Sequence, residues 1–394
     1  MKIKVGVIFG GVSVEHEISI ISAVQAMSNI DTEKYEIIPI YISKDRTFYT
    51  GKMLMDIDIY KDFEDLKRYA KKVTFYKKDG KFYLQSLGLF KKIVEEIDIA
   101  FPIVHGTNVE DGTLQGYLDT IGIPYVGSSV LGAALGQDKV VMKQIFEAEK
   151  LPVSPYLWFY DNEYLNNADS IIKKVKKLGY PVIVKPASLG SSVGITVVKT
   201  EDDLDEAIMD AITYDTKIVI EKMVDNLVEV NCSVLGNYEY QQTSVIEEVM
   251  STEEFLTYKD KYIGGSKGSK SKGMASTNRI IPARITPEVA EKVSELSKQV
   301  FKVLNLSGVC RIDYLIDKKT EKVYINEPNT IPGSLSFYLW EPAGKPYKDL
   351  LDDMITLAIK NYKNKSKKVY SFDTNVLSHV GGTKGLKGMK TKLK

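Results

Sequence analysis

Two carboxylates and an amide stand near the ends of two β-rich runs late in the chain. Asp313 lies in CRIDYLID, and Glu327 and Asn329 close the run VYINEPN. Side chains alternate along a strand, so Glu327 and Asn329 share a face, and pairing of the two runs would bring Asp313 to the same end. These hard oxygen ligands suit Mg²⁺ completed by nucleotide phosphates. The alternative is a solvated polar strand end, but NTIPGS follows directly, and such a turn can present backbone N–H groups to an anion.

A lysine precedes a loop rich in glycine and serine. Lys185 ends a β-rich run, and SLGSSVG follows at 188–194. Glycines let backbone amides approach phosphate, serines add donors, and the lysine can neutralise charge. This is not the GxxxxGK[ST] phosphate loop, because the lysine comes before the glycines and the loop joins two strands. A glycine-serine hairpin alone is usually a flexible turn, and the preceding lysine favours phosphate binding.

Two further segments could complete a nucleotide site. Glu221 and Lys222 end the run KIVIEKMV, where main-chain groups could meet an adenine edge while Glu229 holds ribose hydroxyls. The alternative is an ordinary solvated Glu-Lys pair.

The segment 257–273, TYKDKYIGGSKGSKSKG, has five lysines and one acid. It could close over phosphates as a cationic lid, although, taken without the other features, a solvated disordered loop is the preferred interpretation.

Candidate substrate residues lie in the first unit of the chain. Glu15, in VSVEHEIS after Gly10-Gly11, could receive an ammonium group. Its charge could instead merely complement a helix dipole. His105, in IVHGTNVEDG, ends the third expected strand, and open α/β sheets bind ligands at that end of their strands. A lone histidine is more often structural, but this position favours a functional role.

The elements that must position these residues alternate between β-rich runs and helical segments. Such alternation predicts an α/β fold with right-handed crossovers and a parallel first sheet, and Pro39 suggests that its strand lies at an edge. We expect domains over 1–127, 128–215 and 216–362, followed by a lysine-rich, disordered tail over 363–394. The expected elements are strands at 4–9, 36–43 and 97–104 and a hairpin at 73–84; helices at 131–150 and 168–178 and strands at 181–185 and 194–198; and strands at 217–221, 229–235, 310–316 and 322–326 with helices after Thr286 and at 348–359.

The overall composition excludes several functional classes. The 394 residues carry 53 basic and 52 acidic side chains, a formal charge of +1. So weak a field argues against binding to nucleic acid or anionic membranes. No apolar run approaches the ~18 residues of a membrane span, and the start lacks a signal-peptide pattern, so we expect a soluble, cytoplasmic protein. Two cysteines and three histidines make a disulfide framework, a structural zinc site or a multi-histidine metal site improbable.

Taken together and in this order, eight segments resemble the D-alanine:D-alanine ligase family of ATP-grasp enzymes, over residues 1 to about 360. They are FGGVSVEHEIS, HGTNVEDGTLQG, PYVGS with GQDK, KPASLGSSVG, EK…E, the lysine-rich KY loop, RIDYLID and NEPNTIPGS. The resemblance implies three α/β domains, with an N-terminal parallel, Rossmann-like sheet and ATP held between the central and C-terminal sheets. It implies ATP-dependent ligation of two D-alanines through an acyl phosphate, giving D-alanyl-D-alanine, ADP and phosphate for peptidoglycan precursors. It also implies two Mg²⁺ ions, which Mn²⁺ can replace, and a homodimer.

The resemblance assigns roles to individual positions. The positions that match nucleotide-binding residues are Lys139, Lys185, Ser192, Glu221, Lys222, Glu229 and Lys261. Those that match the metal ligands are Asp313, Glu327 and Asn329. Glu15 matches the acceptor of the first substrate's ammonium group, with His105 beside it, and Ser191 and Tyr262 complete a hydrogen-bonded set that closes the lid. Arg311 and the Gly333 N–H match the groups that stabilise the oxyanion.

The sequence departs from the family at the expected second-substrate site. After NTIPG the family usually has small hydroxyl residues and then a Ser-Leu pair that meets the second substrate's carboxylate, whereas this chain has Tyr338 and Leu339 at those substrate-binding positions. The Tyr338 phenol could still donate a hydrogen bond to that carboxylate, but it is far bulkier than serine. A variant ligase with D-serine or another amino acid as second substrate is therefore an alternative. Tyr262 matches the tyrosine of dipeptide-forming members of the family, so the resemblance favours an amine nucleophile over a hydroxyl. A catalytically inactive ATP-binding regulatory protein is a further alternative, but it would be expected to lack a metal ligand or Arg311, and the sequence retains them all.

Overall fold

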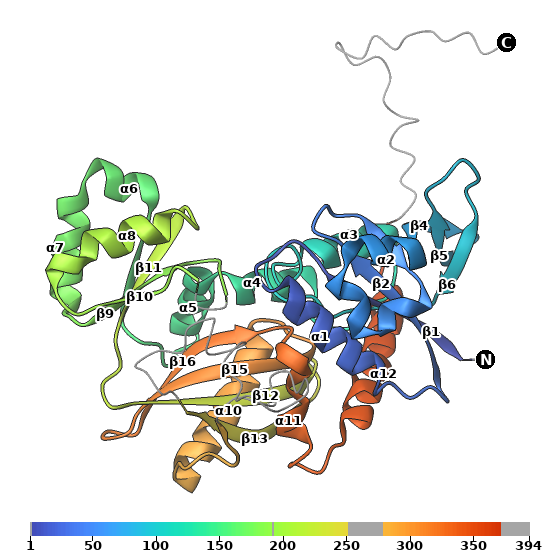
Figure 1. Cartoon of the computed structure of the whole chain (residues 1–394). Helices are drawn as coiled ribbons and strands as arrows, with labels where there is room; N and C mark the ends of the chain where they lie inside the picture. The colour runs from blue at the N-terminus through green and yellow to red at the C-terminus, as the bar shows by residue number, and fades with distance from the viewer. Residues whose placement is uncertain (1, 191–192, 251–278, 372–394) are drawn as a thin grey trace, which may run out of the picture.

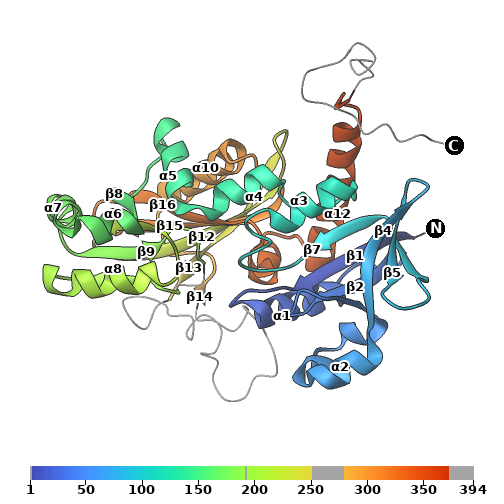
Figure 2. The ribbon, with the colours of Figure 1, turned by 90° about the horizontal axis from the view of Figure 1, so that it is seen from above.

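The computed structural model describes residues 2–190, 193–250 and 279–371, apart from the side chains of residues 63 and 65. Within these ranges the strands form three sheets, of seven, four and five strands (Figure 1). Helices α3, α4 and α5 follow one another between the seven-stranded and four-stranded sheets (Figure 2). No helix in the described ranges is both long and apolar enough to cross a membrane. The sequence prediction of an α/β fold is confirmed.

The first unit is built on the seven-stranded sheet, in the order β6-β5-β4-β3-β2-β1-β7. The strand β1, next to the edge strand β7, pairs in parallel with β2 and β7, and the remaining pairs are antiparallel, so the sheet is mixed where we expected a parallel one. The elements are β1 (Ile3–Gly10), α1 (His16–Met27), β2 (Tyr35–Ile42), β3 (Phe48–Thr50), η1 (Lys52–Met55), η2 (Ile57–Lys61), α2 (Phe63–Tyr69), β4 (Lys71–Lys78), β5 (Lys81–Ser86), β6 (Ile93–Ile97), β7 (Ile99–Pro102) and α3 (Thr113–Ile121).

Two expectations for this sheet are wrong. Pro39 lies in β2, which has neighbours on both sides, and not at an edge. The structure tolerates the proline because β3 pairs with β2 only from Ile40 onward. The single strand expected at 97–104 is two strands, since the chain breaks at Asp98, whose carboxylate accepts the Lys4 backbone N–H at 2.8 Å.

The second unit is built on the antiparallel four-stranded sheet, in the order β10-β9-β11-β8. The helix expected at 131–150 is two helices, because Asp138 ends the first and caps the second by accepting the backbone N–H groups of Val140 and Val141. The strand β11 lies just beyond the expected boundary at 215 but pairs within this sheet. The elements are α4 (Val130–Gln137), α5 (Lys139–Ala148), β8 (Tyr156–Tyr160), α6 (Asp161–Asn166), α7 (Ala168–Leu178), β9 (Val182–Pro186), β10 (Thr196–Val198), η3 (Glu201–Asp203), α8 (Leu204–Ile212) and β11 (Lys217–Lys222).

The third unit is built on the antiparallel five-stranded sheet, in the order β14-β13-β12-β15-β16. Thr286 caps α10 as expected, and the apolar face of that helix packs on one side of the sheet, leaving the other side for polar residues. The elements are β12 (Leu227–Gly236), β13 (Gln241–Val249), β14 (Arg279–Ile280), α10 (Pro287–Val303), β15 (Gly308–Asp317), β16 (Lys322–Asn329), η5 (Gly333–Ser336), α11 (Phe337–Trp340) and α12 (Tyr347–Ser366).

The last helix ties the end of the described chain to its beginning. Leu350 and Ile355 of α12 belong to the same buried cluster as Val5 and Ile8 of β1, and Figure 1 shows the red helix beside the blue strand. The helix continues through Ser366, beyond the end expected near 359, so its last turn occupies the start of the expected tail. The expectation of disorder over 372–394 lies outside the described residues.

Candidate functional site

A row of polar side chains crosses the five-stranded sheet. Asn231 of β12 lies opposite Glu247 of β13 on one side and Asp313 of β15 on the other, and Asp313 lies opposite Glu327 of β16. Because residues opposite each other in a sheet share a face, the four side chains project from the same surface. The strand pairing predicted from the sequence therefore brings Asp313 and Glu327 together.

Asp313 is the centre of a hydrogen-bonded group. Its two carboxylate oxygens each accept a bond of 2.7 Å from the Arg311 guanidinium, through Nε and Nη2. The Asn329 side-chain amide donates to the same carboxylate at 3.1 Å. Paired N–H donors fix both partners in one orientation. The residues expected to bind metal and to stabilise the oxyanion are thus in direct contact.

Lysines of the second unit reach this surface from the other side. The Lys139 Nζ, on the first residue of α5, lies 3.1 Å from Oε2 of Glu327 and donates to the Leu189 carbonyl at 2.6 Å. The Lys185 Nζ, on β9, lies 3.4 Å from Oδ1 of Asn326. Both lysines are buried. Two cations therefore line the space between the four-stranded and five-stranded sheets, as a phosphate site requires.

The Glu221 carboxylate holds the Lys185 ammonium in place. Its oxygens lie 3.2 Å from Lys185 Nζ and 3.3 Å from Lys143 Nζ, and all three residues are buried. Burial alone would raise the pKa of Glu221, but the two lysines lower it below its usual value. Burial lowers the pKa of Lys143. Sequence reasoning missed Lys143, which has no motif around it.

Two other expected nucleotide residues lie nearby in different settings. The Lys222 ammonium donates to the carbonyls of Gly179 (3.1 Å) and Tyr180 (2.8 Å). Its side chain is therefore directed to the loop before β9. Glu229 is half-buried on β12, two residues before Asn231 and so on the same face as the polar row.

Glu15 and His105 are both buried, 7% and 3% exposed. The ring of His105 is held at both nitrogens: Nδ1 lies 2.7 Å from the Ile331 carbonyl and Nε2 lies 2.8 Å from the Ser22 hydroxyl. Burial lowers the pKa of His105. The neutral ring therefore donates from Nδ1 to the carbonyl and accepts at Nε2 from Ser22. His105 thus joins α1 to the 331–334 turn, and its ring nitrogens make protein contacts.

Glu110 is a second residue that sequence reasoning did not single out, although it lies in the quoted motif HGTNVEDG. Its carboxylate accepts the backbone N–H of Gly106 at 2.7 Å and that of Ile331 at 3.4 Å. Burial, with the nearby charge of Glu15 second, raises the pKa of Glu110 to about 8. It therefore braces the same turn that His105 contacts.

The turn that carries Gly333 has an unusual backbone. Ser334, Leu335 and Ser336 all have φ near +50°, a left-handed conformation that non-glycine residues seldom adopt. The Ser334 N–H donates to the Ser22 hydroxyl at 3.0 Å, which links the turn to His105. Strained backbone persists where surrounding contacts impose it, often at functional sites. The expected oxyanion residue thus lies in a turn held by α1.

Tyr338 and Leu339 follow this turn and are both buried. The Tyr338 hydroxyl donates to Glu247 Oε1 at 3.3 Å, and the Arg279 guanidinium lies 3.9 Å from the centre of its ring. Asn231 donates to the same oxygen of Glu247 at 2.9 Å. The phenol that we expected to meet a substrate carboxylate therefore bonds a carboxylate of the protein. Leu339 is 0% exposed, so neither its side chain nor its backbone is accessible to a ligand in this structure.

The remaining expected residues, Ser191, Ser192, Lys261 and Tyr262, lie outside the described residues, as does the whole lysine-rich segment. Among the residues that are described, no three His, Cys, Asp or Glu side chains cluster as a metal site would require. The candidate metal ligands are two carboxylates and one amide, so this set of hard oxygen donors fits Mg²⁺ with phosphate oxygens supplying the rest.

Comparison with family models divides the chain in two. Residues 4–128 match the model described as D-ala D-ala ligase N-terminus, and residues 145–356 match the D-ala D-ala ligase C-terminus. Curated relatives match along nearly their whole length. The D-alanine–D-alanine ligase of Thermosipho melanesiensis is 41% identical, over 95% of this chain and 98% of its own. That of Caldicellulosiruptor bescii is 42% identical, over 94% and 99%.

Solved structures give the same result. The D-alanine-D-alanine ligase of Coxiella burnetii aligns with a TM-score of 0.78 at 28% identity, covering 93% of this chain and 96% of its own. The VanG D-Ala:D-Ser ligase of Enterococcus faecalis aligns with a TM-score of 0.76 at 30% identity, covering 91% and 100%. The D-alanine–D-alanine ligase of Bacillus anthracis, solved with ATP, aligns with a TM-score of 0.66 at 27% identity, covering 92% and 99%. The chain belongs to the D-alanine–D-alanine ligase family and has the ATP-grasp fold.

Proposed function

We propose that this protein joins two D-alanines to D-alanyl-D-alanine and converts ATP to ADP and phosphate. The observation that carries the proposal is that Lys139 contacts Glu327 of the polar row while Lys185 contacts the adjacent Asn326 on β16. Paired cations opposite carboxylates suit the transfer of a phosphoryl group. The names of the relatives at about 40% identity, and the ATP complex of the Bacillus anthracis ligase, support the same reaction.

The chemistry needs an activated carboxylate, because a free carboxylate is a poor electrophile. An oxygen of the first D-alanine's carboxylate attacks the γ-phosphorus of ATP, and ADP leaves. Lys139 and Lys185 neutralise the charge of the transferring group. The amine of the second D-alanine then attacks the carbonyl carbon and loses a proton, and phosphate leaves with the oxygen it gained. Arg311 and the Gly333 N–H stabilise the oxyanion between these steps, and Glu15 receives the first substrate's ammonium group.

Asp313, Glu327 and Asn329 would hold Mg²⁺, and Mn²⁺ offers a similar preference for oxygen ligands. Bound there, the ions would supply positive charge to the phosphate oxygens. Within the protein alone, Arg311 and Lys139 already balance the two carboxylates, at 2.7 Å and 3.1 Å. We infer that these cations keep the carboxylates positioned for the metal.

D-Alanine is the second substrate that we propose, in preference to D-serine. The relatives of highest identity described above are named for D-alanine at both positions. A D-Ala:D-Ser ligase also shares the fold, at 30% identity.

We further propose the setting in which the reaction takes place. The dipeptide would serve peptidoglycan precursor synthesis, and hence cell-wall formation, in the cytoplasm, where ATP and free amino acids are available. We propose a homodimer, and we propose that the three units, with β11 included in the second, move against one another. Neither nucleic acid nor membrane lipid is part of this proposal, because the net charge of +1 gives no attraction to a polyanion.

The test is a product assay by mass and chirality with Mg²⁺ and ATP. D-Alanine alone, D-alanine with D-serine, D-alanine with D-lactate, and L-alanine are compared, each with and without a chelator. We expect D-alanyl-D-alanine from D-alanine alone, and no product with the chelator. No turnover on D-alanine alone would overturn the proposal. A mixed product formed with D-serine at a higher kcat/KM would identify D-serine, and not D-alanine, as the second substrate.

A further inference from the structure

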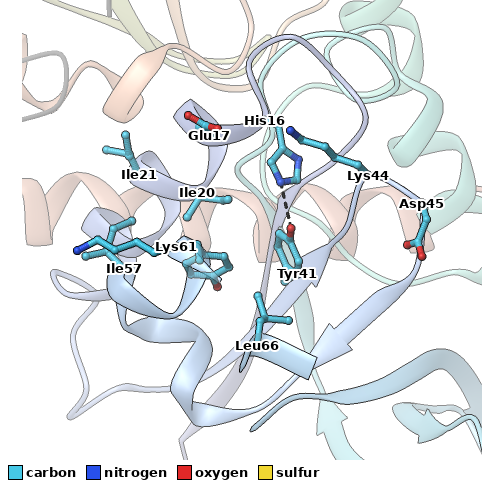
Figure 3. Close-up of a pocket in the computed structure, with 11 residues that line it drawn as sticks. His16, Glu17, Ile20, Ile21, Tyr41, Lys44, Asp45, Ile57, Lys61 and Leu66 are labelled. Carbon is cyan, nitrogen blue, oxygen red and sulfur yellow. Dashed lines mark hydrogen bonds between the residues drawn. The ribbon is translucent and has the colours of Figure 1, made fainter. Parts of the chain in front are cut away.

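The first unit contains a cavity that the ligation site does not use. It has a volume of about 730 Å³ and lies between α1, the end of β2 and the η2–α2 segment (Figure 3). Its walls are largely apolar, and the side chains that form them are Ile20, Ile21, Ile57, Tyr60 and Leu66. The space is large enough for a bicyclic molecule, and ligand pockets in proteins are typically apolar with a few polar groups at fixed positions.

One cation at the rim of this cavity lacks a counter-charge among the described residues. Lys44 makes no ion pair or hydrogen bond with them, and Figure 3 shows its side chain extending toward His16. The other charged residues at the rim are Lys61, Asp45 and Glu17. Lys61 pairs with Asp58 at 2.5 Å, and Asp45 accepts the Thr47 backbone N–H at 3.2 Å. Glu17 lies in the first turn of α1, where its charge complements the helix dipole.

The remaining polar groups of the cavity are bonded to the protein. His16 Nε2 lies 3.0 Å from the Tyr41 hydroxyl, and His16 Nδ1 lies 2.5 Å from the Gly11 carbonyl. Burial lowers the pKa of His16, so the ring is neutral at neutral pH. Among the described residues, Lys44 is therefore the cation at the cavity that has no carboxylate partner, and it lies above an apolar floor.

We propose that this cavity is a binding site for a small carboxylate with a flat or branched apolar body. The apolar body would lie against Ile20, Ile57 and Leu66, and the carboxylate would pair with Lys44. Burial of an apolar surface gives roughly 25 cal/mol per Å², and the charge pair at the rim would select anions over cations. The site is separate from the ligation site, since no residue assigned to nucleotide, metal or oxyanion lines it.

The cavity shares helix α1 with the ligation site, which gives a route for coupling. One side of the helix presents His16, Glu17 and Ile20 to the cavity. The other side carries Ser19 and Ser22, whose hydroxyls bond His105 and the Ser334 N–H. Glu15 directly precedes the helix. A ligand that shifts α1 would therefore move Glu15 and the Gly333 turn, so occupancy of the cavity changes the KM for D-alanine.

The direct test is calorimetric titration of the full-length protein with indole-3-acetate, whose ring suits the apolar floor and whose carboxylate suits Lys44. Tryptamine, which has the same ring with an ammonium group, is titrated in parallel. We expect one indole-3-acetate per chain and much weaker binding of tryptamine. Equal binding of the two compounds, or no binding of indole-3-acetate, would overturn the proposal. The titration involves no turnover, so its outcome is independent of the ligation reaction.

Matched variants locate the site. Lys44→Gln removes the cation, and Ile57→Ser removes part of the floor, while Lys52→Gln and Ile93→Ser change exposed residues of the same types that do not line the cavity. We expect the first two to raise the Kd at least tenfold, about 1.4 kcal/mol, and the two controls to leave it unchanged. Coupling is read from the KM for D-alanine with saturating indole-3-acetate: a shift that Lys44→Gln abolishes supports it, and an unchanged KM would contradict it.

Discussion

Arg311 and Asp313, two residues apart on β15, form a doubly hydrogen-bonded ion pair with both bonds at 2.7 Å. Because the intervening residue faces the other side of the sheet, the two side chains lie next to each other along one face. Asn329 donates to the same carboxylate at 3.1 Å. The arginine proposed to stabilise the oxyanion and the carboxylate proposed to bind the metal are thus one structural unit, so we expect a change in either to disturb both.

Replacing the arginine tests this unit. Arg311→Lys keeps the charge but loses the paired geometry, because lysine cannot offer two N–H groups in a fixed plane. We expect kcat to fall by about 10²–10³, the usual cost of an oxyanion donor. Arg284→Lys is the matched control, since Arg284 also pairs with a carboxylate, that of Glu248, at the exposed surface. Equal loss of activity in both variants would contradict the assignment.

The link between α1 and the Gly333 turn is tested at Ser22. Ser22→Ala removes the donor to His105 Nε2 and the acceptor of the Ser334 N–H at once. Leaving buried polar groups unpaired costs about 1–3 kcal/mol each. We expect a lower melting temperature together with a lower kcat. Ser28→Ala removes an exposed hydroxyl bonded to the Val24 carbonyl at the end of the same helix, and we expect it to change neither.

Glu110 makes a prediction about pH. Its pKa is raised to about 8 by burial and by Glu15, whereas an unperturbed glutamate in the unfolded chain titrates near 4.3. Its stabilising contribution is therefore complete below the unfolded pKa and is lost as pH rises toward 8. Glu110→Gln resembles the neutral form and does not titrate. We expect the melting temperature of Glu110→Gln, relative to that of the natural protein, to rise as the pH increases from 5 to 9. A difference that stays constant with pH would refute the raised pKa.

Tyr338 distinguishes a packing role from a substrate contact. Its hydroxyl donates to Glu247, so Tyr338→Phe should cost only about 0.5–1.5 kcal/mol of stability, the net value of one hydrogen bond. We expect the KM for the second D-alanine to be unchanged. A tenfold rise in that KM, equal to about 1.4 kcal/mol of binding, would show that the phenol contacts the substrate.

Local patterns predicted much of the architecture. The helix at 168–178, the cap at Thr286 and the hairpins flanking Asp79-Gly80 and 188–194 are confirmed, since capping, periodicity and turn residues act over short distances. The pairing of β15 with β16 is also confirmed. The predictions were wrong where a contact between residues distant in the sequence determines the local structure. The Lys4 backbone N–H bonds the Asp98 carboxylate where the strand breaks. Pro39 can lie inside the sheet because β3 pairs with β2 only from Ile40 onward.

The site residues that lie in sequence motifs could be predicted, whereas those whose role depends on tertiary contacts could not. Asp313, Glu327 and Asn329 stand together as their spacing indicated, and Arg311, which the family resemblance had singled out, pairs with Asp313. Lys143 and Ser22 were missed, because each acts through partners more than seventy residues away. The hydrogen-bond partner of the Tyr338 hydroxyl could not be predicted either, because that partner, Glu247, lies on β13, far away in the sequence.

The most direct test of the account is an isotope experiment. D-Alanine labelled with ¹⁸O in its carboxylate is incubated with the enzyme, Mg²⁺ and ATP, and the phosphate released is analysed by mass spectrometry. If the carboxylate is activated as an acyl phosphate, an oxygen of the first substrate leaves with the phosphate, so each dipeptide formed should yield one phosphate carrying one ¹⁸O. Dipeptide formation with unlabelled phosphate would contradict the proposed reaction.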